Sequence, residues 1–372
     1  MTTARLRQIV FATSFGFTGV GTALLGATLP ATLHEWHLSD SSGGTLLFCA
    51  WAGSTTGALF ARGTTGIAAL PGLLLAAAGL VLLGRGVTTY LPAVFLLYGL
   101  GLGMTMTAIS IRRAHEVPAG RTDVEMNRLN LVWALGACVA PWLAVRSLRV
   151  LSVLWLFRAF SLVLTAAALT VLAVLAGPKG EAITERFSAP KEDILRSWAP
   201  LRLCLFAAAS VGLESAIGSW LTTYAERSTL ALGTAVSANS IFWAGLLLSR
   251  ALHSAYGARV IHTRVARAGH ILAVGVAMLL LLFYPSRLVL PLAGLLCGFG
   301  LGPLYPFVLS VALPRYRSVA VFLAAGFGAS LLPWATGALS SACGSLRLGL
   351  LAPAACFIAL AAVAVRMRTE LV

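Results

Sequence analysis

Long apolar runs alternate with short polar segments along almost the whole chain. An α-helix needs about 20 apolar residues to cross the hydrocarbon core of a bilayer, and each run is close to that length. The pattern therefore predicts twelve membrane-spanning helices. They cover residues 9–33, 43–61, 67–84, 91–111, 126–145, 151–176, 200–224, 235–254, 268–284, 288–313, 318–342 and 348–365.

The composition excludes a soluble class of protein. The chain has 372 residues, of which 59% are hydrophobic and 10% are charged, whereas soluble domains carry about 25% charged residues. Disorder is excluded as well, because disordered chains are poor in hydrophobic residues. Arg5 and Arg7 before an apolar run resemble a signal peptide, but the run at 9–33 exceeds the 7–15 residue core of one, so we expect a first span.

The formal net charge of +15 would suggest nucleic acid in a soluble protein. Here most basic residues lie in the segments that are on the same side of the membrane as both termini, and fewer lie in the loops on the other side. Cytoplasmic loops of membrane proteins are enriched in Lys and Arg, so we expect both termini in the cytoplasm and no nucleic-acid partner. The basic residues of the outer loops are Arg85, Arg146, Arg149, Arg227, Arg287 and Arg347.

Three motifs of the first half recur in the second half in the same helix order. Residues 51–53 (WAG) recur at 243–245, residues 96–103 (LLYGLGLG) recur as LLCGFGLG at 295–302, and Gly-Ala-x-x-x-Pro-Trp at 136–142 recurs at 328–334. The repeats predict two six-helix bundles, residues 1–176 and 200–372, joined by a cytoplasmic linker at 177–199. Parallel repeats of this kind are related by an axis along the membrane normal, and transporters built on them bind substrate between the halves.

Several motifs carry a resemblance to a known family. They are residues 212–221 (GLESAIGSWL), residues 242–245 (FWAG) with Arg250, residues 302–306 (GPLYP), Gly26-x-x-Leu29-Pro30 and Asn130-x-x-Trp133. The six-plus-six plan resembles the major facilitator superfamily, and the motifs resemble its fucose:galactose:hexuronate symporter branch. The resemblance implies an all-α major facilitator fold and transport of a sugar or a sugar-like compound.

The chain also departs from the pattern of that family. The loop after the second span usually reads G-x-L-x-D-R-x-G, but Ala61 stands where the acid belongs, before Arg62. The proton-carrying carboxylates that the branch places in its first and fourth spans fall on Gly26 and Met106. The resemblance therefore does not imply proton coupling by the usual pair.

Glu214 is the one carboxylate deep within a predicted span. An ionised acid at the bilayer centre costs about 2.5–3.5 kcal/mol or more, so such residues usually face a partner or an aqueous cavity. We interpret Glu214 as the residue that couples transport to a proton or a sodium ion. The alternative is a fixed ion pair with Arg158 or Arg250 that locks two helices.

Aromatic and amide side chains lie in the same spans. Sugars stack on aromatic rings while amides bind their hydroxyl groups, so a sugar cavity needs both types. Helix packing and interhelical hydrogen bonds are the alternative explanation. The candidate substrate-binding residues are Asn130, Trp133, Trp220, Asn239, Trp243, Tyr305, Thr105, Thr107 and Thr22, and the candidate structural or gating residues are Arg62, Arg158, Arg250, Pro303 and Pro306, of which the two prolines should break the tenth span.

No cofactor or metal is expected. The six cysteines show no C-x-x-C spacing and no histidine cluster. The two glycine runs at 99–103 and 298–302 lie inside apolar spans with no preceding strand, which favours close helix packing over dinucleotide binding. The sequence also lacks a P-loop and a nucleophile–base pair, so an enzyme is not expected.

The favoured function is a secondary active or facilitative transporter of the cytoplasmic membrane that works by alternating access. Its expected partners are a small polar solute, a coupling proton or sodium ion and the lipid bilayer, and we expect a monomer. Two alternatives stay open. One is a drug or metabolite efflux antiporter, since Gly136-x-x-x-Ala140-Pro141 is a degenerate form of an antiporter motif. The other is a sensor on this scaffold that does not transport.

Overall fold

The computed structural model describes residues 3–62, 67–86, 88–116, 122–176, 198–229, 232–256, 263–315 and 319–367. Every regular element in these ranges is a helix, so the all-α prediction is confirmed. The predicted linker at 177–199 lies outside the described residues up to residue 197.

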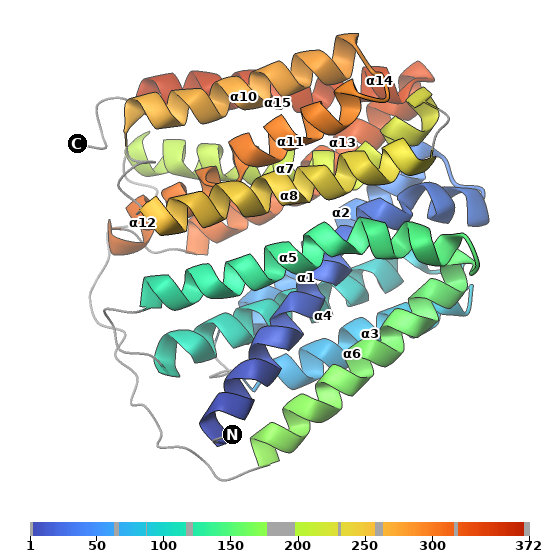
Figure 1. Ribbon diagram of the computed structural model, residues 1–372, viewed down its shortest axis with the longest axis vertical. Helices are drawn as coiled ribbons and strands as arrows, with labels where there is room; N and C mark the ends of the chain where they lie inside the picture. Colours follow the sequence, from blue (N-terminus) through green and yellow to red (C-terminus); the bar gives the residue numbers. More distant parts are fainter. Residues whose placement is uncertain are drawn as a thin grey trace. The chain divides into compact units, whose positions relative to one another are not determined.

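The predicted spans of the first half all lie on helices (Figure 1). These helices are α1 (Thr3–Glu35), α2 (Asp40–Ala61), α3 (Ala69–Gly84), α4 (Leu91–Glu116), α5 (Thr122–Leu148) and α6 (Val153–Ala176). The second half contains α7 (Trp198–Thr229), α8 (Leu232–Tyr256), α10 (Arg264–Phe283), α11 (Val289–Leu301), α12 (Leu304–Arg315), α13 (Val319–Cys343), α14 (Leu346–Gly349) and α15 (Leu351–Arg366).

Eleven helical segments of the described residues are long and apolar enough to cross a membrane, and α3 is a shorter apolar helix of 16 residues. Together they account for the twelve predicted spans. One span, Val289–Leu309, is built from α11 and the start of α12, which the sequence analysis expected as one interrupted helix. The chain is a multi-pass membrane protein.

The helices form two compact units. One contains Met1–Leu24 and Cys49–Ser188, and the other contains Leu25–Phe48 and Ala189–Val372. The C-terminal part of α1, from Leu25, and the N-terminal part of α2, up to Phe48, therefore belong to the second unit. Both parts come from the first half of the sequence. Each of these two helices contributes to both units.

The glycine runs allow neighbouring helices to approach closely. A Cβ atom on Gly99 or Gly103 of α4 would collide with the backbone of α2, and one on Gly101 would collide with α3. In the second unit, a Cβ atom on Gly298 of α11 would collide with α8, and one on Gly300 would lie 2.6 Å from a backbone carbonyl of α10. The predicted packing role of both runs is confirmed. The same alternation in both halves also agrees with the internal repeat.

Two buried tyrosines each connect two helices. The hydroxyl of Tyr98 on α4 donates to the carbonyl of Gly21 on α1 at 2.9 Å. The hydroxyl of Tyr224 on α7 donates to the carbonyl of Leu281 on α10 at 2.5 Å. A buried hydroxyl without a partner is costly in apolar surroundings, so each bond fixes one helix against another.

Candidate functional site

The site is organised around the break between α11 and α12. Helix α11 ends at Leu301, and Pro303 has no N–H to donate to the carbonyl of Phe299, four residues earlier. A carbonyl left bare in a membrane interior costs free energy. The ring of His270 on α10 supplies the missing donor, because its Nδ1 atom lies 3.1 Å from the Phe299 oxygen.

The second proline frees a second carbonyl in the same way. Pro306 cannot donate to the carbonyl of Gly302, and Nε of Arg250 on α8 donates to that oxygen at 3.1 Å. The prediction that the prolines interrupt the tenth span is confirmed. The break also has a structural consequence: side chains from α8 and α10 take over hydrogen bonds that the helix backbone cannot make.

Arg250 also binds the intramembrane carboxylate. Its Nη2 atom lies 3.3 Å from Oε2 of Glu214, and each of the two side chains is 13% exposed. The other candidate partner, Arg158, lies in the first unit, where its Nε donates to the carbonyl of Gly84 at 2.7 Å. Of the two predicted partners, the structure therefore assigns Arg250 to Glu214. This arginine joins α7, α8 and the break after α11.

Two further predicted residues lie on the face of α8 that carries Arg250. Asn239 donates through Nδ2 to the carbonyl of Gly218 at 3.2 Å and to the hydroxyl of Thr222 at 2.6 Å, both on α7. Trp243 packs on the same α7 glycine, since a Cβ atom on Gly218 would lie 2.7 Å from its indole ring. The α7–α8 interface thus brings Asn239, Trp243, Arg250 and Glu214 together.

Asn239 is fully buried, and its oxygen Oδ1 has no hydrogen-bond partner among the described residues. The orientation of the amide follows from its contacts, because the carbonyl of Gly218 can accept only from the NH2 group. The interface therefore contains one unused acceptor on the side of Trp243 that faces away from the ion pair.

Trp220 and Tyr305 have other surroundings. Trp220 is 0% exposed and donates from Nε1 to the carbonyl of Pro333 on α13 at 2.9 Å. Its ring also packs on Gly337 of α13, where a Cβ atom would lie 2.8 Å away. Tyr305 is partly buried on α12. In this structure Trp220 acts as a packing residue between α7 and α13.

Most of the predicted site residues in the first unit make contacts inside that unit. The hydroxyl of Thr22 donates to a carbonyl of its own helix at 2.8 Å, and the hydroxyl of Thr105 does the same at 2.8 Å. Trp133 is buried where α5 crosses α1, and Asn130 is exposed. Thr107 and Arg62 are partly buried.

The structure gives a physical reason for the glycine at position 26. A Cβ atom on Gly26 would collide with the carbonyl of Gly218 and lie 2.7 Å from Cα of Ser219. Helices α1 and α7 therefore meet backbone to backbone in the second unit. No carboxylate side chain fits at this position in the observed packing.

One polar cluster was missed by the sequence analysis. The carboxylate of Asp40, at the start of α2, accepts two hydrogen bonds from the guanidinium group of Arg227 on α7, at 2.7 and 2.8 Å. Ser340 on α13 donates to the same carboxylate at 2.6 Å. The backbone N–H of Ser41 donates to the hydroxyl of Ser341 at 2.7 Å. We call these five residues the Asp40 cluster. An acid in the first turn of α2 was visible in the sequence, but its partners lie 187 or 300 positions away.

A pair of imidazoles was also missed. The ring of His253 on α8 lies 5.0 Å from that of His270, measured between centroids. Its Nδ1 lies 2.8 Å from the carbonyl of Ser249 and donates to it, because a carbonyl oxygen only accepts. The Nε2 atom of His253 is buried without a hydrogen-bond partner among the described residues. The pair lies one turn of α8 beyond Arg250.

Neither a scan against protein-family models nor a search of the curated proteins found a match. Solved structures do match. The fucose:proton symporter FucP of E. coli is 17% identical over 97% of this chain and 98% of its own, with a TM-score of 0.63. A structure of FucP in the outward conformation, described as a major facilitator superfamily transporter, gives a TM-score of 0.65 at 16% identity. The nucleoside transporter NupG gives 0.71 at 14% identity, with the same coverage.

The chain therefore has the fold of major facilitator superfamily transporters, as the sequence analysis expected. At these identities the likeness establishes the fold. The structural neighbours are transporters and not enzymes.

Proposed function

We propose that the protein is a secondary transporter that moves a small hydroxylated solute across the cytoplasmic membrane by alternating access. The observation that carries the proposal is the Glu214–Arg250 pair, which is buried among apolar spans and tied to a permanent helix break. Buried ionisable residues in membrane spans usually mark substrate or ion pathways. The proposal includes cytoplasmic termini, a monomer, no enzymatic activity, and repeat halves at residues 1–176 and 200–372.

Glu214 is proposed as the coupling residue. While it is ionised, its attraction for Arg250 holds α7 against α8. A proton or a sodium ion bound to the carboxylate would cancel that attraction, while the carbonyl of Gly302 could still hold Arg250. The charge state of one acid would then control the contact between two helices, which is what coupling to an ion gradient requires.

The α7–α8 interface supplies the proposed chemistry for the solute. Asn239 offers an unused acceptor and Trp243 an aromatic face, which suit a hydroxyl group and the C–H face of a sugar ring. Tyr305, Trp220, Asn130, Trp133 and the three threonines remain candidates. Fucose and nucleosides, the solutes named for the structural neighbours, both carry several hydroxyl groups.

The Asp40 cluster is proposed as a contact that opens and closes during the cycle. It binds the start of α2 to α7 and α13 through one carboxylate and two serine hydroxyls. Side-chain contacts of this kind can be exchanged for water at modest cost, since the side chain of Arg227 is already 48% exposed. With the termini in the cytoplasm, this cluster would lie at the outer surface.

The proposal can be tested in proteoliposomes with radiolabelled fucose and a labelled nucleoside. Counterflow measures exchange without a gradient, and uptake driven by a proton or a sodium gradient measures coupling. We expect Glu214→Gln to retain counterflow and to lose gradient-driven accumulation. Glu35→Gln, which removes an exposed carboxylate at the end of α1, is the matched control and should retain both.

Unchanged accumulation by Glu214→Gln would refute the coupling role. If the wild-type protein binds neither solute in a thermal-shift titration and shows no counterflow, the hydroxylated-solute proposal is wrong. A ligand that binds only the folded protein raises the apparent stability, so binding and transport can be separated in the same preparation.

A further inference from the structure

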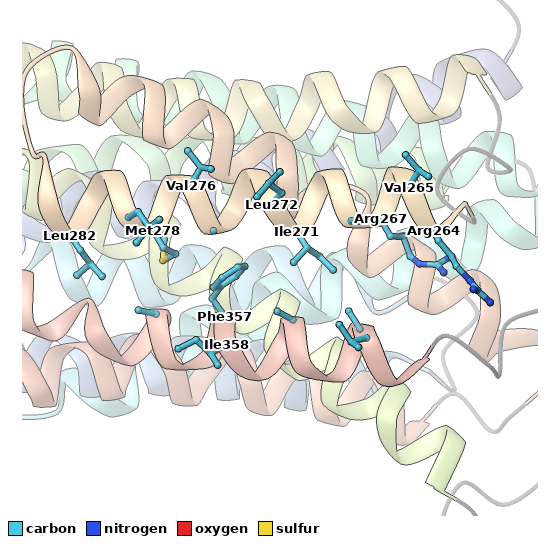
Figure 2. Close-up of a pocket in the computed structure, with 17 residues that line it drawn as sticks. Arg264, Val265, Arg267, Ile271, Leu272, Val276, Met278, Leu282, Phe357 and Ile358 are labelled. Carbon is cyan, nitrogen blue, oxygen red and sulfur yellow. The ribbon is translucent and has the colours of Figure 1, made fainter.

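A groove runs between α10 and α15 on the side of α10 that faces away from α11. It has a volume of about 950 Å³, at the upper end of the roughly 300–1,000 Å³ typical of ligand sites. Its two arginines lie at one end, and the remaining lining residues are apolar or glycine. Figure 2 shows Phe357 of α15 pointing toward α10, with Arg264 and Arg267 together at the end of the groove. We call this feature the α10–α15 groove.

The two helices that form the groove are the least buried spans of the described residues. Only 28% of the α10 window and 22% of the α15 window is buried. On α10 the side chains of His270, Val274 and Leu281 face inward and are buried, whereas Val265 and Leu272 are largely exposed. In a multi-pass membrane protein such an apolar exposed face lies against lipid.

The length of the groove matches the bilayer. From Arg264 to Leu282 the lining covers 18 residue steps of α10, or about 27 Å at 1.5 Å per residue, close to the roughly 30 Å hydrocarbon core. A lipid chain of one leaflet spans about half of that thickness, so it would extend from Arg267 to about Met278. The arginines therefore lie at the level of the headgroups.

The charge of the groove selects among lipids. Among the described residues, its lining contains two guanidinium groups and no carboxylate. The guanidinium of Arg267 also lies over the ring of Phe307 on α12, at 4.8 Å from its centroid. Basic pockets between spans at the cytoplasmic surface bind acidic lipid headgroups, and the topology expected from the positive-inside rule puts this end there.

We propose that the α10–α15 groove binds an anionic phospholipid. Its phosphate lies at Arg264 and Arg267, and one acyl chain lies along the apolar lining. The acyl chain packs at mid-depth beside the ring of Phe357. This ring already covers Gly275, since a Cβ atom on Gly275 would lie 2.7 Å from the ring. This inference is independent of the solute that the protein moves and of the role of Glu214.

The test is native mass spectrometry of the purified protein, titrated with dioleoyl-phosphatidylglycerol or dioleoyl-phosphatidylcholine. Each arginine near the surface contributes about fivefold to the affinity for an acidic lipid, so the preference for the anionic lipid should be on the order of 30-fold. In Arg264→Gln/Arg267→Gln this preference should fall to about onefold. Arg5→Gln, which removes an exposed arginine at the start of α1, should keep it.

A second variant tests the apolar part of the site. Ala361→Trp places an indole in the groove and should weaken binding of both lipids, whereas Ala166→Trp on the exposed face of α6 should not. Thermal unfolding of each variant identifies any that fails to fold, and in that case the arginine variants decide. Glycerol phosphate tests whether the headgroup alone is bound, and it should not displace the lipid at tenfold excess.

Three results would overturn the proposal. Equal affinity of the wild-type protein for both lipids would remove the role of the arginines. An equal loss in Arg5→Gln would show that the charge attracts lipid without a defined site. Displacement by glycerol phosphate would show an anion site that does not use the groove.

Discussion

The Arg250→Met substitution tests the central feature of the site, an arginine shared by a carboxylate and a freed carbonyl. Methionine keeps an unbranched apolar chain as far as the position of Nε and removes both contacts. Removing one partner of a buried ion pair costs about 3–5 kcal/mol, and the 3.3 Å contact with 13% exposure places this pair near 3 kcal/mol. Loss of the donor to Gly302 adds about 1 kcal/mol. We expect Arg250→Met to lose about 4 kcal/mol of unfolding free energy.

The double variant Glu214→Gln/Arg250→Met separates the two contributions. It leaves no charge stranded, so it should be about 2 kcal/mol more stable than Arg250→Met although it has one more substitution. With an unfolding entropy of about 2.1 cal/mol/K per residue, 4 kcal/mol corresponds to a fall in Tm of about 5 °C, of which the double variant should regain about 2–3 °C.

The assay is thermal unfolding of the purified variants in lipid nanodiscs, followed by intrinsic fluorescence at neutral pH. Protonation of Glu214 would remove the stranded charge, so the deficit of Arg250→Met should shrink on acidification. The reasoning is refuted if the double variant melts at or below the temperature of Arg250→Met. That result would mean that the ion pair contributes nothing beyond the carbonyl contact.

Three further predictions concern other contacts. Tyr98→Phe should lose about 1 kcal/mol of unfolding free energy with the bond to Gly21, measured by chemical denaturation, and an unchanged value would contradict the assigned bond. The hydrogen bond from Arg113 lowers the pKa of Glu125, so this contact should stabilise the fold above about pH 4.3 and be lost as the pH falls further. Melting temperatures measured along an acid series test this. The prediction is contradicted if Glu125→Gln loses as much stability on acidification as the wild type. Gly26→Asp should give little folded protein by size-exclusion chromatography because the side chain would enter α7, and a well-folded variant would show that the close contact is wrong.

The fold followed from the sequence because its signals are local or repeated. Apolar runs give the spans, and the glycine pattern at 99–103 and 298–302 indicates both close packing and the repeat. The proline break was predictable too, since a proline removes a known backbone donor. Several helices extend beyond the predicted ranges by a few residues, because polar residues such as Asp40 begin helices that the hydropathy pattern alone starts later.

The site was predicted less completely because its contacts join distant positions. Glu214 was singled out by its charge and its position deep within an apolar span, but the choice between Arg158 and Arg250 needed the packing of α7 on α8. Trp220 is of a residue type that sugar-binding sites use, yet its indole packs against α13. Residue type shows which side chains could bind a solute. The direction in which each side chain points depends on helix rotation, which a single sequence does not encode.

The two prolines at the break between α11 and α12 have a consequence for movement in this half of the protein. A kink caused by strain can straighten and regain its backbone hydrogen bonds, but Pro303 and Pro306 have no N–H to give in any conformation. The carbonyls of Phe299 and Gly302 therefore need outside donors in every conformation of these helices. Arg250 can leave Gly302 without loss of a hydrogen bond only when another donor takes its place, so the number of hydrogen bonds is kept while the partners are exchanged.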